Sequence, residues 1–238
     1  MLRLKITIDT KQQPIPFEYH GYLQGIIYHA LSEESGSFLH DTGYGDERIY
    51  KLFVYSELIG KYRIENKKLV FISPVSFYIS SVSSDMLNEL YMYFNTVSEI
   101  CFKDKKFNVL SAEPVDDIEY HKDGEYVLQT ISPITCYKTD EKKFTSYFHP
   151  KSQDFECSIQ ENLFRKYETL YGKSPEEIFE ISDVIKSKKT LVRYKGMVYE
   201  SYLTTMKVKV SDSYLKLLMH TGLGAKNSAG FGMVKIIG

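Results

Sequence analysis

Four glycines lie within eleven residues near the end of the chain, in the segment GLGAKNSAGFGMVKIIG. Glycine adopts positive φ without steric cost and lets another backbone approach closely, so such a loop either turns sharply or binds a polyanion. The spacing of these residues fits neither the dinucleotide fingerprint nor the P-loop, and a strand follows instead of a helix. The segment is therefore not a standard nucleotide-cofactor site, while a turn and a phosphate-binding loop both stay open. Its glycines are Gly222, Gly224, Gly230 and Gly232.

A basic segment is the second feature that could bind phosphate. Residues 1–118 carry 12 Lys or Arg and 16 Asp or Glu, whereas residues 119–238 carry 18 and 15. Residues 181–209 hold seven basic residues against Asp183 and Glu200, for a local net charge of +5. This charge is typical of a phosphate-facing stripe, and a solvated hairpin is the alternative. The basic residues are Lys186, Lys188, Lys189, Arg193, Lys195, Lys207 and Lys209.

Composition indicates an ordinary soluble globular protein. The 238 residues are 43% hydrophobic and 26% charged, and no segment approaches the roughly 18 consecutive apolar residues of a membrane span. The N-terminal MLRLKITIDT reads as a strand and not as a signal peptide. Three cysteines without CxxC spacing argue against a disulfide framework and against a cysteine zinc site. We therefore expect a cytoplasmic protein that binds no membrane.

The elements of the first half follow a recognisable order. The pattern predicts a strand over 2–9, a helix over 19–34, strands from 48 to 79 broken near ENKK, a helix over 84–97 and strands from 100 to 115. Strand, helix, two strands, helix and strand is the order of a ferredoxin-like domain.

The second half repeats this order. A strand EYVLQTISPITCY precedes a helix SQDFECSIQENLFRKYETLYG that Gly172 closes, and two strands over 179–210, a short helix DSYLKLLMHTGLG and a final strand follow. We therefore expect an α+β fold of two tandem ferredoxin-like domains, residues 1–120 and 121–238. A single large α+β domain is the alternative. Because no RGFGFV-type aromatic signature is present, base stacking on sheet aromatics is not expected.

The segment GLGAKNSAGFGMVKI resembles the C-terminal glycine-rich motif of the RAMP superfamily, and most closely that of the CRISPR-associated Cas-six endoribonucleases, which cut repeat RNA. The segments PFEYHGYLQGIIYHAL, KLFVYSEL, FISPVSFYISS and QTISPITCY are similar to that family's first helix, second strand and following strands. The resemblance implies cleavage without metal or cofactor. The ribose 2′-hydroxyl attacks the adjacent phosphate and leaves 5′-hydroxyl and 2′,3′-cyclic phosphate ends.

The resemblance also implies three catalytic residues, which are Tyr28 in the first helix, His40 shortly after it and Lys51 at the start of the next strand. Histidine suits proton transfer near neutral pH, lysine supplies positive charge, and a tyrosine hydroxyl can hold the nucleophile or donate to phosphate. Tyr28 falls outside the apolar arc of its helix and so is free to face a cleft. His29 is the main alternative to His40. The assignment of the general base and the general acid between Tyr28 and His40 stays open.

The expected partner is CRISPR repeat RNA, as precursor and as mature guide, while other CRISPR effector subunits and a homodimer are left open. We expect the glycine loop to pack against the first helix and, with the basic segment, to contact the RNA backbone. A non-catalytic RAMP subunit that holds guide RNA is the alternative function, and an unrelated tandem ferredoxin-like binding module is a third. The expected RNA-binding residues are Lys186, Lys188, Lys189, Arg193, Lys195, Gly222, Gly224, Lys226, Asn227, Gly230 and Gly232.

Overall fold

The computed structural model describes residues 3–46, 48–116, 120–173 and 177–238. The first half folds around β1 (Arg3–Asp9), whose alternating apolar side chains Leu4, Ile6 and Ile8 are fully buried. β1 lies at the centre of an antiparallel sheet with the order β3-β6-β1-β8-β7. The other strands of this sheet are β3 (Phe53–Tyr55), β6 (Val75–Ser81), β7 (Glu99–Phe102) and β8 (Lys105–Val115). Helices α1 (His20–His29) and α3 (Ser84–Thr96) bury their apolar stripes in the same core.

The second half has its own sheet and core. Its strands follow the order β12-β13-β9-β14, and its helices α4 (Gln153–Tyr171) and α5 (Asp212–Thr221) share one hydrophobic core with them. The Ser152 hydroxyl accepts the amide hydrogen of Phe155 at the start of α4. Gly172 ends this helix in the left-handed region, as expected. The strands are β9 (Glu125–Thr130), β12 (Phe179–Tyr194), β13 (Met197–Val210) and β14 (Val234–Ile236).

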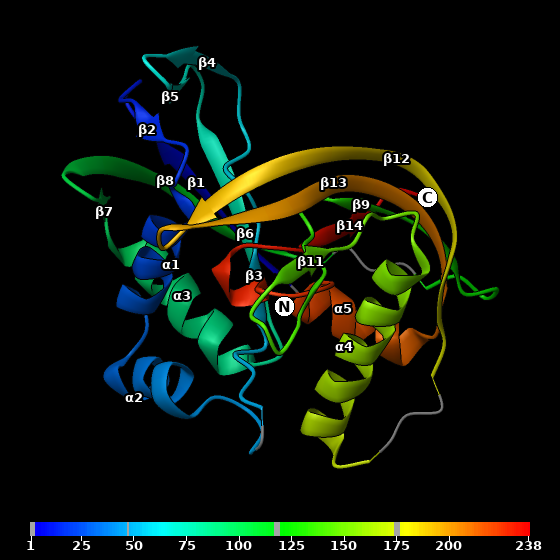
Figure 1. Ribbon diagram of the computed structural model, residues 1–238. Coiled ribbons are helices and arrows are strands. Elements are labelled where there is room, and N and C mark those ends of the chain that lie inside the picture. The colour runs from blue at the N-terminus through cyan, green and yellow to red at the C-terminus, as the bar shows by residue number, and fades with distance from the viewer. Residues whose placement is uncertain (1–2, 47, 117–119, 174–176) are drawn as a thin grey trace.

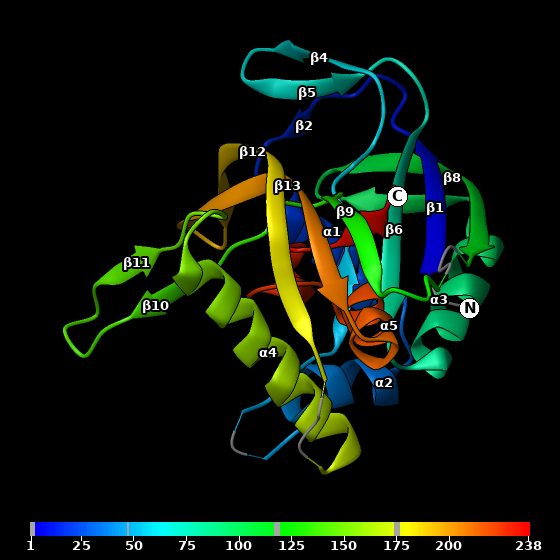
Figure 2. The ribbon, with the colours of Figure 1, turned by 90° about the vertical axis from the view of Figure 1, so that its right-hand side faces the viewer.

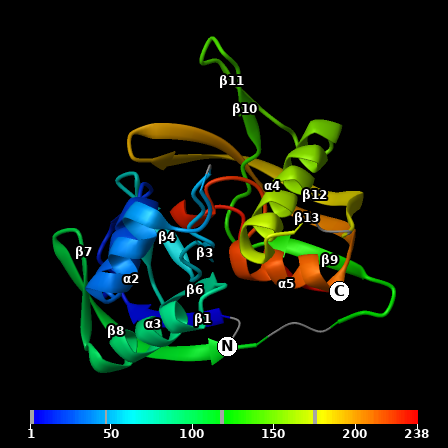
Figure 3. The ribbon, with the colours of Figure 1, turned by 90° about the horizontal axis from the view of Figure 1, so that it is seen from below.

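The strand orders confirm two tandem ferredoxin-like units. In each half the second, third, first and fourth of the four main strands lie side by side, and the two units sit next to each other in the view from below (Figure 3). β8 ends at Val115 and β9 begins at Glu125, so the proposed division at residue 120 falls between the two sheets. Within the described part of the chain, no helix is both long and apolar enough to cross a membrane.

Two small sheets project from this frame (Figure 2). One has the order β2-β5-β4 and the other pairs β10 with β11. Short helical turns complete the chain. These elements are β2 (Ile15–Pro16), β4 (Tyr62–Glu65), β5 (Lys68–Phe71), β10 (Tyr137–Thr139), β11 (Thr145–Tyr147), α2 (Glu33–Ser37), the π-helical turn η1 (Phe38–Thr42) and the 3₁₀ turn η2 (Asn227–Ala229).

Three expected elements are shorter than the sequence pattern predicts. The helix expected over 19–34 ends at His29, because the Ser32 hydroxyl accepts the Ser35 amide hydrogen and caps a new helix, α2. The strand expected to start near residue 48 begins at Phe53, just after Leu52, whose φ of 46° interrupts extended backbone. The strand expected over 125–137 ends at Thr130.

The long hairpin formed by β12 and β13 arches from the second half across to α1 (Figure 1). At its tip the Tyr194 hydroxyl donates to the Gln24 Oε1 atom of α1 at 2.5 Å. Gln24 in turn donates from Nε2 to the Ser228 carbonyl at 2.7 Å. One side chain of α1 therefore joins the hairpin tip to the glycine-rich loop.

Candidate active site

The structure brings Tyr28, His40 and Lys51 together beyond the end of α1. Tyr28 lies in the last turn of α1, and its ring stands edge-on to that of His40 with the centroids 6.5 Å apart. His40 lies in η1, and its backbone carbonyl accepts a hydrogen bond from Lys51 Nζ at 2.7 Å. The π-helical turn, the last turn of α1 and the segment before β3 thus place the imidazole, the phenol and the ammonium group at one location.

The imidazole of His40 is oriented by its neighbour in the sequence. Its side chain is 78% exposed, and Nδ1 lies 2.6 Å from Asp41 Oδ1. Because a carboxylate only accepts hydrogen bonds, Nδ1 carries the hydrogen in this pair. The lone pair of the neutral ring is therefore on Nε2, which is the atom available for a substrate proton.

The phenol of Tyr28 is suited to donate a hydrogen bond. Burial raises the pKa of Tyr28 to about 12, and the nearby Tyr194 hydroxyl adds to this shift. A tyrosine hydroxyl is protonated at neutral pH even without this shift, and the shift extends that range to higher pH. Burial lowers the pKa of Lys51, although the neighbouring Asp41 carboxylate opposes the shift. With one N–H bound to the His40 carbonyl, the Lys51 ammonium keeps two N–H groups for a ligand.

The alternative histidine of α1 points elsewhere. The ring of His29 packs edge-on against Tyr93 of α3, with the centroids 6.1 Å apart. His20, at the start of α1, is buried beneath the glycine-rich loop, and burial lowers its pKa to about 4. Its neutral ring donates from Nδ1 to the Ala229 carbonyl at 3.2 Å. His40 is therefore the histidine of the first half that the fold presents beside Tyr28 and Lys51.

All four glycines of the loop have positive φ, between 68° and 88°. A Cβ atom at Gly230 would lie 2.5 Å from the Tyr55 ring and 2.6 Å from His20 Nδ1, and a Cβ atom at Gly232 would lie 1.9 Å from the Leu223 carbonyl oxygen. The glycines are thus required by tight turns against the protein itself. The loop packs on α1, as expected, through the bonds that Gln24 and His20 make to its carbonyl groups.

A buried lysine that the sequence analysis missed holds this loop from the other side. Lys166 of α4 is 2% exposed, and its Nζ atom donates to the Asn227 Oδ1 atom at 2.8 Å and to the Gly222 and Thr221 carbonyl oxygens at 2.9 and 3.3 Å. Asn227 donates from Nδ2 to the carbonyl oxygens of Leu223 and Phe231. The Asn227 amide therefore fastens the loop internally.

Helical spacing is the sequence signal that points to Lys166. It continues the apolar stripe of α4 that Phe155, Ile159 and Leu163 form, and a charged residue on such a stripe is buried only when it is paired or neutralised. Burial lowers the pKa of Lys166 to about 7, and the nearby Arg48 guanidinium adds to this shift.

The basic residues of the β12–β13 hairpin do not form one stripe. Lys188 and Lys189 are consecutive in an extended strand, so their side chains leave opposite faces. Lys189 Nζ pairs with Glu200 at 2.6 Å, and Arg193 lies 3.7 Å from Glu18, two residues before α1. Lys195 lies in the turn, with φ of 48°. Lys186 and Lys188 are exposed and take part in none of the ion pairs among the described residues.

Comparison with known proteins places these features in context. Residues 111–236 match a family model described as CRISPR associated protein Cas6, C-terminal. The CRISPR-associated endoribonuclease Cas6 of Pyrococcus furiosus is 27% identical over 231 residues, which cover 94% of this chain and 84% of that protein. The matched family region contains the β12–β13 hairpin and the glycine-rich loop.

Two solved structures share the fold over nearly the whole chain. A RAMP protein described as binding different RNA substrates has a TM-score of 0.85 at 22% identity, with 100% of both chains covered. The product of a Cas6-related gene from Pyrococcus furiosus has a TM-score of 0.84 at 24% identity, with 99% of this chain and 98% of that chain covered. Both likenesses concern the fold.

Proposed function

Because the chain belongs to the Cas6 family, whose C-terminal model matches residues 111–236, we propose that it is an endoribonuclease that cuts CRISPR repeat RNA in precursor transcripts. The resemblance expected from the sequence is thereby confirmed. The curated relative from Pyrococcus furiosus is itself named an endoribonuclease. The partner of the protein in this proposal is repeat RNA, which it would meet in the cytoplasm.

One observation carries the catalytic part of the proposal. Tyr28, His40 and Lys51 lie 12 and 11 positions apart in the sequence and meet at one location in the fold. They bring together a hydrogen-bond donor, an oriented imidazole and a cation, respectively. In-line phosphoryl transfer needs a base, an acid and stabilisation of the charge that develops on the phosphate oxygens. The trio supplies one group for each of these tasks.

We propose the following roles for the three residues. His40 Nε2 takes the proton of the ribose 2′-hydroxyl while the 2′-oxygen bonds to phosphorus. The bond from phosphorus to the 5′-oxygen breaks, and its electron pair stays on the 5′-oxygen, which receives a proton from the Lys51 ammonium. Tyr28, whose hydroxyl is protonated at neutral pH, donates to a non-bridging phosphate oxygen. The products carry a 2′,3′-cyclic phosphate and a 5′-hydroxyl, and solvent restores both proton-transfer groups.

A modified leaving group tests this assignment. We would compare repeat RNA from the CRISPR arrays of the source organism with the same RNA carrying sulfur in place of the scissile 5′-oxygen. A thiolate leaves without being protonated, so the sulfur substrate restores the cleavage rate of a variant that lacks the general acid. It does not restore the rate of a variant that lacks the general base. His40→Ala should slow cleavage of both RNAs by about 10²–10⁴-fold, the usual contribution of positioned proton transfer.

Lys51→Ala should slow cleavage of the oxygen substrate and recover substantially with the sulfur substrate. If His40→Ala recovers with sulfur and Lys51→Ala does not, the two roles are reversed. If the unaltered protein binds the repeat RNA tightly and never cuts it, the protein is the non-catalytic RNA-holding subunit instead.

A further inference from the structure

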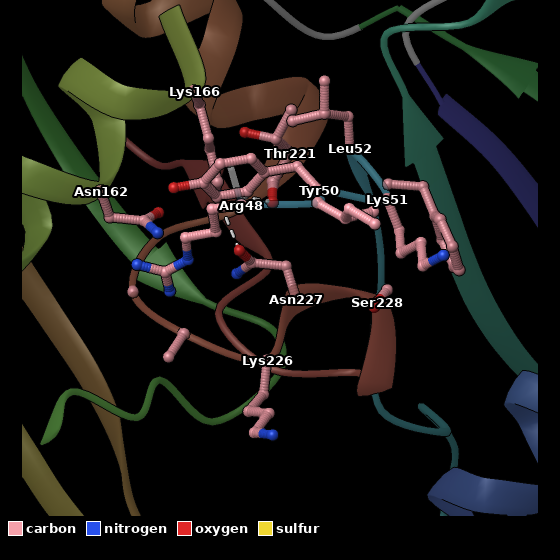
Figure 4. A pocket seen from close by; sticks show the side chains of 14 residues that line it. Arg48, Tyr50, Lys51, Leu52, Asn162, Lys166, Thr221, Lys226, Asn227 and Ser228 are labelled. Atoms are coloured by element: carbon pink, nitrogen blue, oxygen red, sulfur yellow. Dashed lines mark hydrogen bonds between the residues drawn. The ribbon is translucent and has the colours of Figure 1, made fainter. Parts of the chain in front are cut away.

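A pocket of about 140 Å³ lies between the two halves of the protein, beside the candidate active site (Figure 4). The segment before β3 forms one wall, α4 forms a second and the glycine-rich loop forms a third. Lys51 also lines it, so the pocket and the catalytic trio share one residue. Polar side chains of the lining include Arg48, Tyr50, Asn162, Lys166 and Lys226.

The lining of this pocket is strongly positive. It contains Arg48, Lys51, Lys166 and Lys226, and no Asp or Glu is present among the lining residues that the structure describes. Lys166 binds only neutral acceptors, which are two carbonyl oxygens and an amide oxygen. Arg48 and Lys226 contact the faces of Tyr50 and Tyr199, respectively, and form no ion pair in the described chain. Among the residues that the structure describes, these three side chains therefore have no carboxylate partner in an ion pair.

Two polar atoms of the lining are buried without a partner. Tyr50 is 9% exposed, and its hydroxyl makes no hydrogen bond within the described residues. The Oδ1 atom of Asn162 in α4 is in the same situation. Buried polar groups are almost always hydrogen-bonded, so an unpartnered hydroxyl and amide oxygen beside these cations indicate a ligand that is anionic and also carries a hydroxyl.

We propose that this pocket binds a sugar-phosphate unit of the RNA next to the scissile phosphate, an inference that rests on the proposed endoribonuclease function. The guanidinium of Arg48 faces the phosphate charge, the Tyr50 hydroxyl donates to a phosphate oxygen, and Asn162 Oδ1 accepts the hydrogen of a ribose hydroxyl. Lys166 keeps the glycine-loop wall in place through its bonds to Asn227, Gly222 and Thr221.

Size and position both favour an RNA backbone over a free cofactor. The pocket is smaller than the roughly 300–1,000 Å³ of sites that enclose a whole small molecule, so it takes a phosphate group and part of a sugar while the base stays outside. Lys51 connects it to the trio, which places the bound unit beside the phosphate that is cut.

Tyr50→Phe is the most direct test because it removes only an unpartnered hydroxyl. Affinity would be measured for the repeat RNA carrying a 2′-deoxy residue before the mapped cleavage site, so that it binds without being cut. Tyr50→Phe should weaken binding about tenfold, the effect of losing a hydrogen bond to a charged group, while the unfolding temperature stays equal or rises. Tyr171→Phe, at the exposed end of α4, is the matched control and should bind as the unaltered protein does.

Arg48→Gln should weaken binding and reduce the slope of log K against log salt by about 0.7, the value for one lost phosphate contact on a single strand. Lys106→Gln, an exposed lysine of β8 paired with Glu99, is its control. If Tyr50→Phe and Arg48→Gln both bind the RNA with the affinity and salt slope of their controls, the pocket is not an RNA subsite.

Inorganic phosphate separates this proposal from the catalytic one. Phosphate should raise the unfolding temperature of the unaltered protein and raise it less for Arg48→Gln than for Lys106→Gln. If the protein fails to cut repeat RNA but shows this difference, the anion site stands and the proposed function fails. If it cuts the RNA while neither variant differs from its control in RNA or phosphate binding, the function stands and the anion site is wrong.

Discussion

The buried Lys166 predicts an unusual dependence of stability on pH. Its pKa is lowered to about 7 in the folded protein by burial and by the nearby Arg48, whereas a lysine in the unfolded chain has a pKa of about 10.4. Between these values the unfolded chain binds more protons than the folded one, so stability must rise with pH. The contribution is complete above the unfolded pKa and is lost as the pH falls towards about 7.

The magnitude follows from the same two pKa values. One proton of difference changes the free energy of unfolding by about 1.4 kcal/mol per pH unit. Because the folded lysine is half deprotonated near its own pKa, the gain between about pH 7 and about pH 8.5 is roughly 1 to 2 kcal/mol. Cys136, which also lies near Lys166, has its pKa raised to about 12 by burial and stays a neutral thiol over this range.

Urea unfolding of Lys166→Met and of the unaltered protein, each followed across this pH range, measures the effect. The quantity of interest is the difference between the two pH slopes, because groups common to both proteins cancel. Lys166→Met should lose the rise with pH. Lys216→Met, which changes an exposed lysine on α5, should keep it.

Equal pH slopes for the unaltered protein and Lys166→Met would show that Lys166 does not cause the rise in stability. If Lys166→Met does not fold cooperatively, the pKa of the Lys166 ammonium in the unaltered protein can be read directly by ¹⁵N NMR of labelled lysine. A value near that of free lysine would contradict the account equally well.

Two further predictions concern the loop and the hairpin. Gly230→Ala should destabilise the protein by about 2–5 kcal/mol, because it combines left-handed strain of about 1–2 kcal/mol with overpacking of about 1–3 kcal/mol against Tyr55 and His20. The control is Gly196→Ala, at a similar φ in open space, which should lose only the strain energy. Equal losses of stability in thermal unfolding would show that packing is irrelevant at Gly230. Lys188→Glu should weaken binding of repeat RNA and flatten its salt dependence by more than the loss of one contact. Lys189→Glu should have a smaller effect on both quantities, because Lys189 already pairs with Glu200. Unchanged affinity and salt slope for Lys188→Glu would show that the hairpin is not part of the RNA-binding surface.

The sequence pattern was sufficient for the fold because both halves are built from amphipathic elements with clear ends. The alternation of Leu4, Ile6 and Ile8 marks β1, and Ser152 and Gly172 mark the two ends of α4. The predicted end of the first helix was wrong, because the apolar stripe of α1 continues past His29 in the sequence. In the structure Ser32 caps a separate helix, α2, in that segment. Local capping competes there with helix continuation, and periodicity alone does not decide between them.

The candidate site was only partly visible in the sequence. Tyr28, His40 and Lys51 were identified through the family resemblance, and the structure adds the Asp41 partner that fixes the imidazole. The pocket that joins Tyr50 to Asn162 could not be predicted, because its walls are far apart in the sequence and meet only when the two halves pack. Lys166 could have been found from its place on a buried helical stripe, although its partners in the glycine loop could not.

The most direct measurement of the central claim uses repeat RNA with a single 2′-deoxy residue before the mapped cleavage site, assayed with and without EDTA beside the unmodified RNA. We expect the unmodified RNA to be cut in EDTA to products with 2′,3′-cyclic phosphate and 5′-hydroxyl ends. The 2′-deoxy RNA should bind and remain intact, because its nucleophile has been removed. Cleavage of the 2′-deoxy RNA at the same position, together with loss of all cleavage in EDTA, would show that a metal-activated water is the nucleophile and would contradict the account.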